Sequence, residues 1–301
     1  MSGPERDLVG YGRHRPRAAW PGGDGVAINV VLVYEEGSER ALPDGDARSD
    51  GWGEYAEAAP EGVRDLGGET HYEYGSRAGI WRLARLLDRY ELGVTVSATA
   101  VALERNPEVA AWMAERGHDL LGHGWRWTDV AAMTRDEERT HLYRALDSYV
   151  RVTGARPLGW NSRSFPSVHT RALVAEEGGF AYYSDPCNDD LPYFVEEGGH
   201  PLLVVPYSKT TNDSRYLVSP GFGGPSDFVD HCRRALDYLC GETAEQGGAM
   251  MTVAVHARWS GQPARADAVR EFVEYALAKP GARFMRRIEI TRFWLDRYGN
   301  S

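Results

Sequence analysis

Cysteine is scarce in this chain of 301 residues. The only three are Cys187, Cys232 and Cys240, and no CxxC motif occurs. Cys232 and Cys240 fall on one expected helix, where eight residues separate their Cα atoms by about 12 Å, whereas a disulfide requires less than about 7 Å. No basic residue that could activate a thiolate adjoins Cys187 in the sequence. We therefore expect reduced thiols and no cysteine nucleophile.

Cations and long apolar runs are scarce as well. Lys and Arg number 34 against 44 Asp and Glu, which gives a net charge of −10. Nucleic acids and anionic membranes bind basic surfaces, so we expect neither as a partner. No apolar run approaches the roughly 20 residues that span a bilayer, and the polar, Arg-rich residues 1–20 lack the pattern of a signal peptide. The sequence predicts a cytoplasmic protein.

A phosphate-binding glycine loop is also missing. The segments 10–12 and 221–224 are glycine-rich, but neither follows a strand and opens a helix, and no GxxxxGK[ST] motif occurs. A nucleotide-binding fold is therefore disfavoured.

The chain has instead a regular alternation of short apolar runs and segments of helical periodicity. Such alternation favours βα units around a parallel sheet. We expect residues 1–301 to form one α/β domain with an N-terminal arm at 1–25. The Gly-, Ala- and acid-rich stretch at about 37–75 has little periodicity and is expected to be an insertion or lid. The expected strands are 26–34, 94–101, 119–121, 158–160, 180–184, 202–207 and 250–256, and helices are expected to begin near Ser76, Pro107, Thr134, Ser226 and Pro263.

Polar side chains collect where the expected strands end. The carboxyl ends of parallel barrel strands converge on one face, so these groups are expected to share a site. The strand-end residues are Glu35, Glu36, His123, Asp185 and His256, with Arg156 and Trp160 flanking one strand.

The segments around these residues resemble the motif series of a known family. In order they are Tyr34-Glu35-Glu36, Gly122-His123-Gly124-Trp125-Arg126-Trp127, Arg156-Pro157-Leu158-Gly159-Trp160, Ser184-Asp185 and Val255-His256-Ala257-Arg258. They resemble the polysaccharide deacetylase (NodB-homology) superfamily and, more closely, its allantoinase-like branch. The resemblance runs from about Leu8 to Trp294. It implies a single distorted (β/α)7, TIM-like barrel that forms a homo-oligomer, a tetramer or a dimer.

Family deacetylases bind a divalent metal through an aspartate of the first motif and two histidines in His-x3-His. Here Glu36 and His123 match two of these ligands, but Trp127 stands at the third position. An indole offers only an N–H donor, and two protein ligands fall short of the usual three plus water. The allantoinase-like branch shares these departures and is understood to open a cyclic ureide without a metal. We therefore expect no cofactor, with zinc held by Glu36 and His123 as the alternative.

The expected activity is metal-independent hydrolysis of a C–N bond in a small cyclic amide or ureide, such as allantoin, a hydantoin or an imide. Glu35, held by Arg156, is expected to act as the general base on water, and His256 to protonate the leaving nitrogen. Glu36 and His123 would position the water or the substrate. Trp125, Trp127 and Trp160 would wall the pocket, and Arg163, Asp185 and Arg258 would bind the substrate.

Two alternatives stay open. One is a metal-dependent N-deacetylase of an N-acyl amine or amino sugar that recruits Asp185 or His256 as a further ligand. The other is an inactive barrel that acts as a binding module. The loop 161–165, Asn-Ser-Arg-Ser-Phe, replaces the Tyr-Thr-Gly-Arg that follows Gly-Trp in the allantoinase-like branch, so the substrate need not be allantoin.

Overall fold

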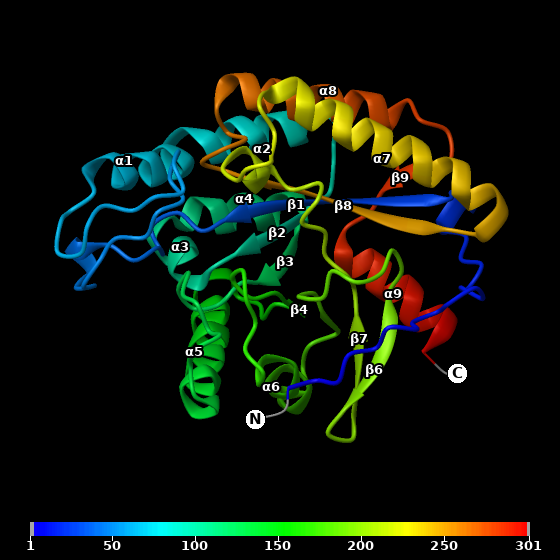
Figure 1. Ribbon diagram of the computed structural model, residues 1–301, viewed down its shortest axis with the longest axis horizontal. Coiled ribbons are helices and arrows are strands. Elements are labelled where there is room, and N and C mark those ends of the chain that lie inside the picture. Colours follow the sequence, from blue (N-terminus) through cyan, green and yellow to red (C-terminus); the bar gives the residue numbers. More distant parts are fainter. Residues whose placement is uncertain (1–2, 300–301) are drawn as a thin grey trace.

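One curled, largely parallel sheet organises the protein in the computed structural model, which describes residues 3–299 (Figure 1). The strands lie in the order β6-β7-β5-β4-β3-β2-β1-β8, and β9 pairs with β1. All these pairs are parallel except β6 with β7. The strands are β1 Val26–Tyr34, β2 Thr95–Ala98, β3 Asp119–Gly122, β4 Gly159–Trp160, β5 Tyr182–Tyr183, β6 Tyr193–Glu197, β7 His200–Val204, β8 Ala249–His256 and β9 Ala282–Phe284.

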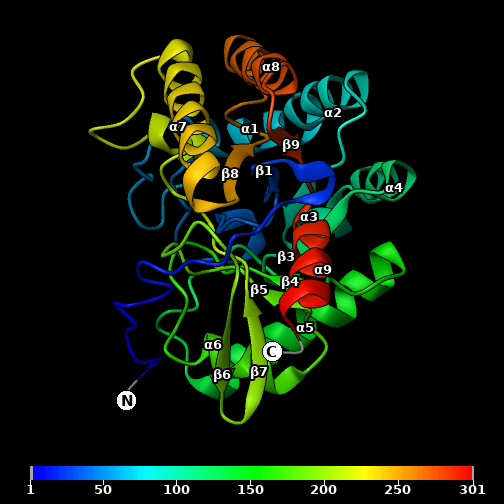
Figure 2. The same cartoon turned by 90° about the vertical axis from the view of Figure 1, so that its right-hand side faces the viewer.

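Helices cover the outer, convex face of the sheet. Seen along the curl in Figure 2, α2, α4, α5, α7 and α8 surround the strands. The helices are α1 Leu66–Tyr74, α2 Ile80–Arg89, α3 Ala100–Arg105, α4 Pro107–Arg116, α5 Arg135–Thr153, α6 Thr170–Glu177, α7 Pro225–Gln246, α8 Pro263–Leu277 and α9 Arg287–Tyr298. Short turns occupy Pro21–Gly23, Leu42–Asp44, Gly75–Gly79 and Asp213–Tyr216. This is the distorted α/β barrel that the sequence predicted.

Strand β1 lies at the centre of the core, and all nine of its residues are buried. Val30 and Leu32 pack against the surrounding helices, whereas Val31 and Val33 face Ala254 inside the curl. A strand covered on both faces needs a nearly continuous apolar sequence, which residues 26–33 supply. The one polar residue among them, Asn29, is buried and donates its side-chain amide to Met285 O at 3.0 Å.

Local signals set the helix ends as predicted. Thr134 and Glu137 form a capping box at the start of α5, and Gly154 ends it in the left-handed conformation. Pro107 opens α4, and Gly117 closes it with φ of 65°.

Some elements differ from the sequence prediction. The expected strand at 94–101 ends at Ala98, because α3 begins at Ala100. β7 covers part of the expected strand 202–207, whereas β6 and β9 and the helices α1, α3, α6 and α9 were not expected. β6 alternates between half-buried and exposed residues and lies at the sheet edge, so it lacks the apolar run that marks the other strands.

Two peripheral segments are fixed to the barrel. In the arm, Trp20 is buried against Phe293 and Trp294, and its Nε1 donates to Ala249 O at 2.8 Å. The segment 37–75 precedes and includes α1, at the left in Figure 1. Helix α9 lies at the opposite end, where the strands begin, since Arg287 N donates to Thr95 Oγ1 and Ile288 N to Asp119 Oδ2.

The three cysteines are unpaired, as expected. Cys187 is nevertheless exposed, whereas Cys232 is buried. Among residues 3–299, no helix is long and apolar enough to cross a membrane.

Candidate active site

Glu35 is the centre of a buried polar cluster at the carboxyl ends of the strands. Its Oε1 lies 3.0 Å from His123 Nε2, and its Oε2 accepts from Arg258 Nη1 at 2.8 Å. Burial alone would raise the pKa of the Glu35 carboxyl, but the Arg258 charge and the His123 hydrogen bond bring this pKa below its usual range. Glu35 is therefore a carboxylate at neutral pH.

The proton on His123 follows from its two partners. Its Nδ1 lies 2.9 Å from Asn161 O, and a carbonyl oxygen only accepts, so Nδ1 carries a hydrogen. Nε2 then meets the Glu35 carboxylate and needs a proton to make a hydrogen bond. His123 is thus placed to donate both to Asn161 O and to the Glu35 carboxylate, and the contact with Asn161, which follows β4, fixes the orientation of the ring.

Arg258, and not Arg156, holds Glu35, so the predicted Arg156 contact is wrong. Arg156 donates to Glu177 at 2.6 Å and lies against the Phe180 ring. It precedes β4 and therefore lies where the strands begin, away from Glu35. Arg258 follows β8 directly and is fully buried, so it pairs with Glu35 and does not reach toward substrate as the sequence suggested.

Glu36 ties two backbone segments together instead of facing the pocket. Its Oε2 accepts from Glu35 N at 2.9 Å, and its Oε1 accepts from Arg258 N at 3.0 Å. Burial raises the pKa of the Glu36 carboxyl to about 7. A Cβ added at Gly75 would lie 2.7 Å from this carboxyl group, which explains the glycine in the 75–79 turn.

His256 forms a second buried dyad with Asp213. The two residues join at 2.5 Å between His256 Nδ1 and Asp213 Oδ1. Asp213 Oδ2 also accepts from His256 N at 2.7 Å and from Ser260 Oγ at 2.6 Å. Because the carboxylate accepts from Nδ1, the remaining ring nitrogen, Nε2, is free for chemistry. Asp213 was not predicted from the sequence, because it lies in a short turn and not at the end of an apolar strand.

One cavity of about 270 Å³ brings the predicted strand-end groups together. Glu35, His123 and His256 line it, and Asp185 and Trp127 do so as well. The structure therefore confirms that these five residues share a site, although their roles are untested. Other lining residues from outside the sequence prediction include Trp52, Ser97, Phe165, Lys209 and Trp259.

Three predicted substrate-binding residues lie elsewhere. Trp160 is buried against Phe180 in the core. Trp125 packs under Arg144 on another face of the protein. Arg163 points away from the cavity, donates to Trp127 O at 2.7 Å and pairs with Asp50. Alternation along each strand explains the loss of Trp160, since its neighbour Asn161 faces the cavity.

Two lining residues have backbone conformations that are rare for non-glycine residues. Trp52, with φ of 65°, comes from the 37–75 insertion, and Ser164, with φ of 43°, comes from the 161–165 loop. The Trp52 carbonyl accepts from Arg258 Nε at 2.9 Å, so the insertion is docked on the guanidinium that holds Glu35. Such strained positions cluster at functional sites, and the insertion is part of this one.

The donor set fits a divalent metal poorly. Both Glu36 oxygens already accept backbone hydrogen bonds, and the Trp127 indole has no lone pair to give. The positive Arg258 guanidinium lies 3.6 Å from Glu36 Oε1. Within residues 3–299, no three His, Cys, Asp or Glu side chains are grouped to hold a metal ion.

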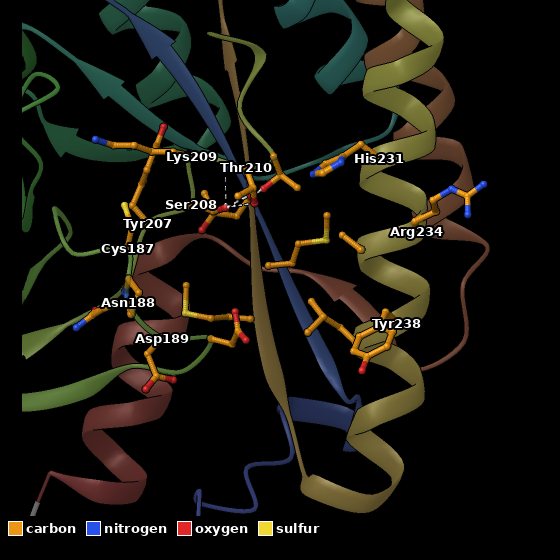
Figure 3. Close-up of a pocket in the computed structure, with 18 residues that line it drawn as sticks. Cys187, Asn188, Asp189, Tyr207, Ser208, Lys209, Thr210, His231, Arg234 and Tyr238 are labelled. Atoms are coloured by element: carbon orange, nitrogen blue, oxygen red, sulfur yellow. Dashed lines mark hydrogen bonds between the residues drawn. The ribbon is translucent and has the colours of Figure 1, made fainter. Parts of the chain in front are cut away.

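A second, larger cavity of about 720 Å³ lies beside β8, between α7 and the segments 187–190 and 206–211 (Figure 3). Cys187 and Asp189 line it on one side, and His231 and Tyr238 on the other. Glu35, His123 and His256 do not line it. The larger cavity is therefore not the candidate active site, which is the smaller cavity that contains Glu35, His123 and His256.

Comparison with known proteins agrees with this geometry. A family model described as polysaccharide deacetylase matches residues 70–172. A protein of Schizosaccharomyces pombe, named as a polysaccharide deacetylase, is 31% identical over 309 residues that span 96% of each chain. The chain belongs to the polysaccharide deacetylase family. A protein of Helicobacter pylori named peptidoglycan deacetylase is 27% identical over 42% of this chain and 43% of its own.

Solved structures place this family member near an allantoinase. The crystal structure of Puue allantoinase matches with a TM-score of 0.94 and 40% identity, covering 99% of each chain. A Pseudomonas aeruginosa protein named as a polysaccharide deacetylase matches with a TM-score of 0.92 and 41% identity, covering 97% of this chain and 98% of that one. The predicted resemblance to the allantoinase-like branch is confirmed.

Proposed function

We propose that the protein hydrolyses a C–N bond in a small cyclic amide or ureide and uses only protein groups as acid and base. The observation that carries this proposal is that Glu35 and His256, each held by a buried partner of opposite charge, line one small cavity. Family membership and the likeness to an allantoinase support a hydrolase of C–N bonds.

Glu35 is the group that activates water in this proposal. Arg258 contacts Oε2 of the Glu35 carboxylate, and His123 contacts Oε1. Each oxygen retains a second lone pair that can accept a proton from water. The bound water attacks the carbonyl carbon as Glu35 takes its proton. Because the low pKa of Glu35 makes it a weak base, stabilisation of the tetrahedral oxyanion must supply much of the rate enhancement.

His256 supplies the proton to the leaving nitrogen. Asp213 accepts from Nδ1 and its negative charge stabilises the imidazolium, so Nε2 carries the transferable proton. When the tetrahedral intermediate collapses, the C–N bond breaks and the nitrogen takes this proton. Water has then given one proton to Glu35, and His256 has given one to the amine. Transfer of a proton from Glu35 to His256 through solvent restores both groups for the next cycle.

The walls of the cavity suit a small, flat substrate. Trp52, Trp127, Trp259 and Phe165 all contribute to its lining, and aromatic faces stack on planar rings. A volume of about 270 Å³ is at the low end for small-molecule sites, which favours one ring over a polymer chain.

A metal-dependent N-deacetylase is the second candidate, because the curated relatives are named as deacetylases. Parallel assays of cyclic ureides, imides and N-acetyl amino sugars distinguish the two, with metal content measured on the same sample. Ring opening that survives chelation supports our proposal. Release of acetate that requires stoichiometric zinc supports the deacetylase, and ligand binding without any turnover supports an inactive binding module.

We further propose that the protein forms a homo-oligomer. Leu8 and Val9 in the arm are exposed, as is Tyr238 on α7, and apolar groups of this kind commonly lie in subunit interfaces. Light scattering at several concentrations tests this, and a monomer throughout would contradict it.

A further inference from the structure

One side chain that lines the active-site cavity, Lys209, takes no part in the proposed reaction. Lys209 is the only lysine or arginine among the residues that line this cavity, which all lie within 3–299. It is also one of only two lysines in the whole sequence. The other, Lys279, pairs with Asp237 at 2.5 Å, whereas Lys209 forms no ion pair with any carboxylate in the described part of the chain.

Lys209 lies at the rim formed by the 161–165 loop. Its Nζ donates to Ser164 O at 3.0 Å and lies 5.6 Å from the centre of the Phe165 ring. An ammonium has three donors, and the structure uses one of them, so two remain for a ligand. Ser164 and Phe165 line the same cavity, which places this cation beside any molecule bound there.

The direction of the side chain distinguishes the two cavities. Lys209 borders both, but Figure 3 shows it extending away from the α7 residues His231 and Arg234 that face the larger cavity. Its charge is therefore directed to the smaller cavity, with Glu35 and His256.

The charges already present leave Lys209 without a counter-ion. Glu35 is neutralised by Arg258, and Asp213 is paired with His256. Asp185, the other lining acid, accepts from Asn161 and from Ser162 N instead of from Lys209. Lys209 is exposed, so water solvates its ammonium in the free protein, and a neutral ureide would offer it no counter-charge.

We propose that Lys209 binds a carboxylate carried by the substrate, so that the substrate class is a small cyclic amide or ureide with an anionic substituent. This inference rests on the proposed function. The carboxylate lies at the rim, remote from the bond that is cleaved, and Lys209 is thus a specificity-determining residue. Its contribution is to binding, and it should change KM with little effect on kcat.

Hydantoin-5-acetate and hydantoin-5-acetamide form a matched test pair, since they have nearly the same shape and differ in charge. The wild type should prefer the acetate by about fivefold in KM, the scale of a partly exposed ion pair. Lys209→Met should remove this preference, Lys209→Arg should retain it, and Lys279→Met should leave it unchanged. Equal KM values for the two compounds in the wild type, or an unchanged preference in Lys209→Met, would overturn the proposal.

Amine labelling tests Lys209 independently of turnover. Acetic anhydride modifies both lysines, and mass spectrometry of peptides separates them. The acetate ligand should slow modification of Lys209 more than the acetamide does, with Lys279 as the internal reference. If neither compound is hydrolysed, the proposed function fails for this substrate pair while the labelling still decides the role of Lys209. Equal protection by the two ligands, or none, would overturn the anion site.

Discussion

Arg258 Nη1 donates to Glu35 Oε2 at 2.8 Å in a site where both side chains are buried. The same guanidinium binds the carbonyl of Trp52 through Nε. A single side chain, two positions after the end of β8, thus pairs with the carboxylate at the end of β1 and contacts the 37–75 insertion. The charge of the Glu35 carboxyl and the docking of the insertion therefore depend on the same cation.

Glu35→Gln should lower turnover by about 10²–10⁴-fold, because the amide cannot accept a proton from water. Gln fills the same space and can still accept from Arg258, so the fold should be retained by circular dichroism. Glu177→Gln is the matched control, since that carboxylate pairs with Arg156 away from the pocket. Near-native activity of Glu35→Gln would remove it from the mechanism.

Arg258→Met should destabilise the protein by about 3–5 kcal/mol, since it leaves a buried carboxylate unpaired. Arg156→Met should cost less than about 1 kcal/mol, because that ion pair is partly exposed. Urea denaturation of both variants measures the difference. The double variant Arg258→Met with Glu35→Gln should recover part of the stability. Equal losses for the two arginine variants would contradict the assignment of Arg258 as the buried partner of Glu35.

Asp213→Asn should reduce kcat by about 10²–10⁴-fold with little change in KM. The amide no longer fixes the proton on His256 Nδ1 or stabilises the imidazolium. Ser260→Ala, which removes only one hydrogen bond to the same carboxylate, is the control and should cost less than tenfold. Equal effects of the two variants would argue against a special role for the dyad.

Glu39 predicts a pH dependence of stability. Burial raises the pKa of its carboxyl to about 7, above the usual value of 4.5. The folded state therefore retains a proton that the unfolded state has lost, and stability falls as the pH rises from about 4.5 to 7. Glu39→Gln should remove this penalty and stabilise the protein by about 3 kcal/mol at pH 8, with little gain at pH 4. Thermal unfolding at both pH values measures it, and a gain that is equal at the two would contradict the titration of Glu39.

The sequence predicted the groups that stand immediately after a strand. Glu35 directly follows β1, His123 directly follows β3, and His256 is the last residue of β8. The convergence of parallel strands brings these three residues together. The predicted contact of Arg156 with Glu35 was wrong because Arg156 precedes β4 and so lies at the opposite end of the barrel. Arg258 lies in one of the predicted motifs, but it was expected to bind substrate, whereas it pairs with Glu35. The sequence does not show which carboxylate a buried guanidinium contacts.

The rest of the site comes from segments without periodicity. Asp213 lies in a turn, 43 residues before His256, and Trp52 lies in the insertion. Neither has a strand or helix pattern that fixes its direction. Their places depend on tertiary contacts: Asp213 on the His256 backbone, and Trp52 on Arg258.

We propose that Glu35 activates water and His256 protonates the leaving nitrogen without a metal. The most direct measurement is ring opening of a cyclic ureide by protein whose metal content is determined on the same sample, before and after chelation. The account predicts unchanged turnover with far less than one metal ion per chain, and loss of turnover in Glu35→Gln. Turnover that rises in proportion to bound zinc, and that vanishes on chelation, would contradict it.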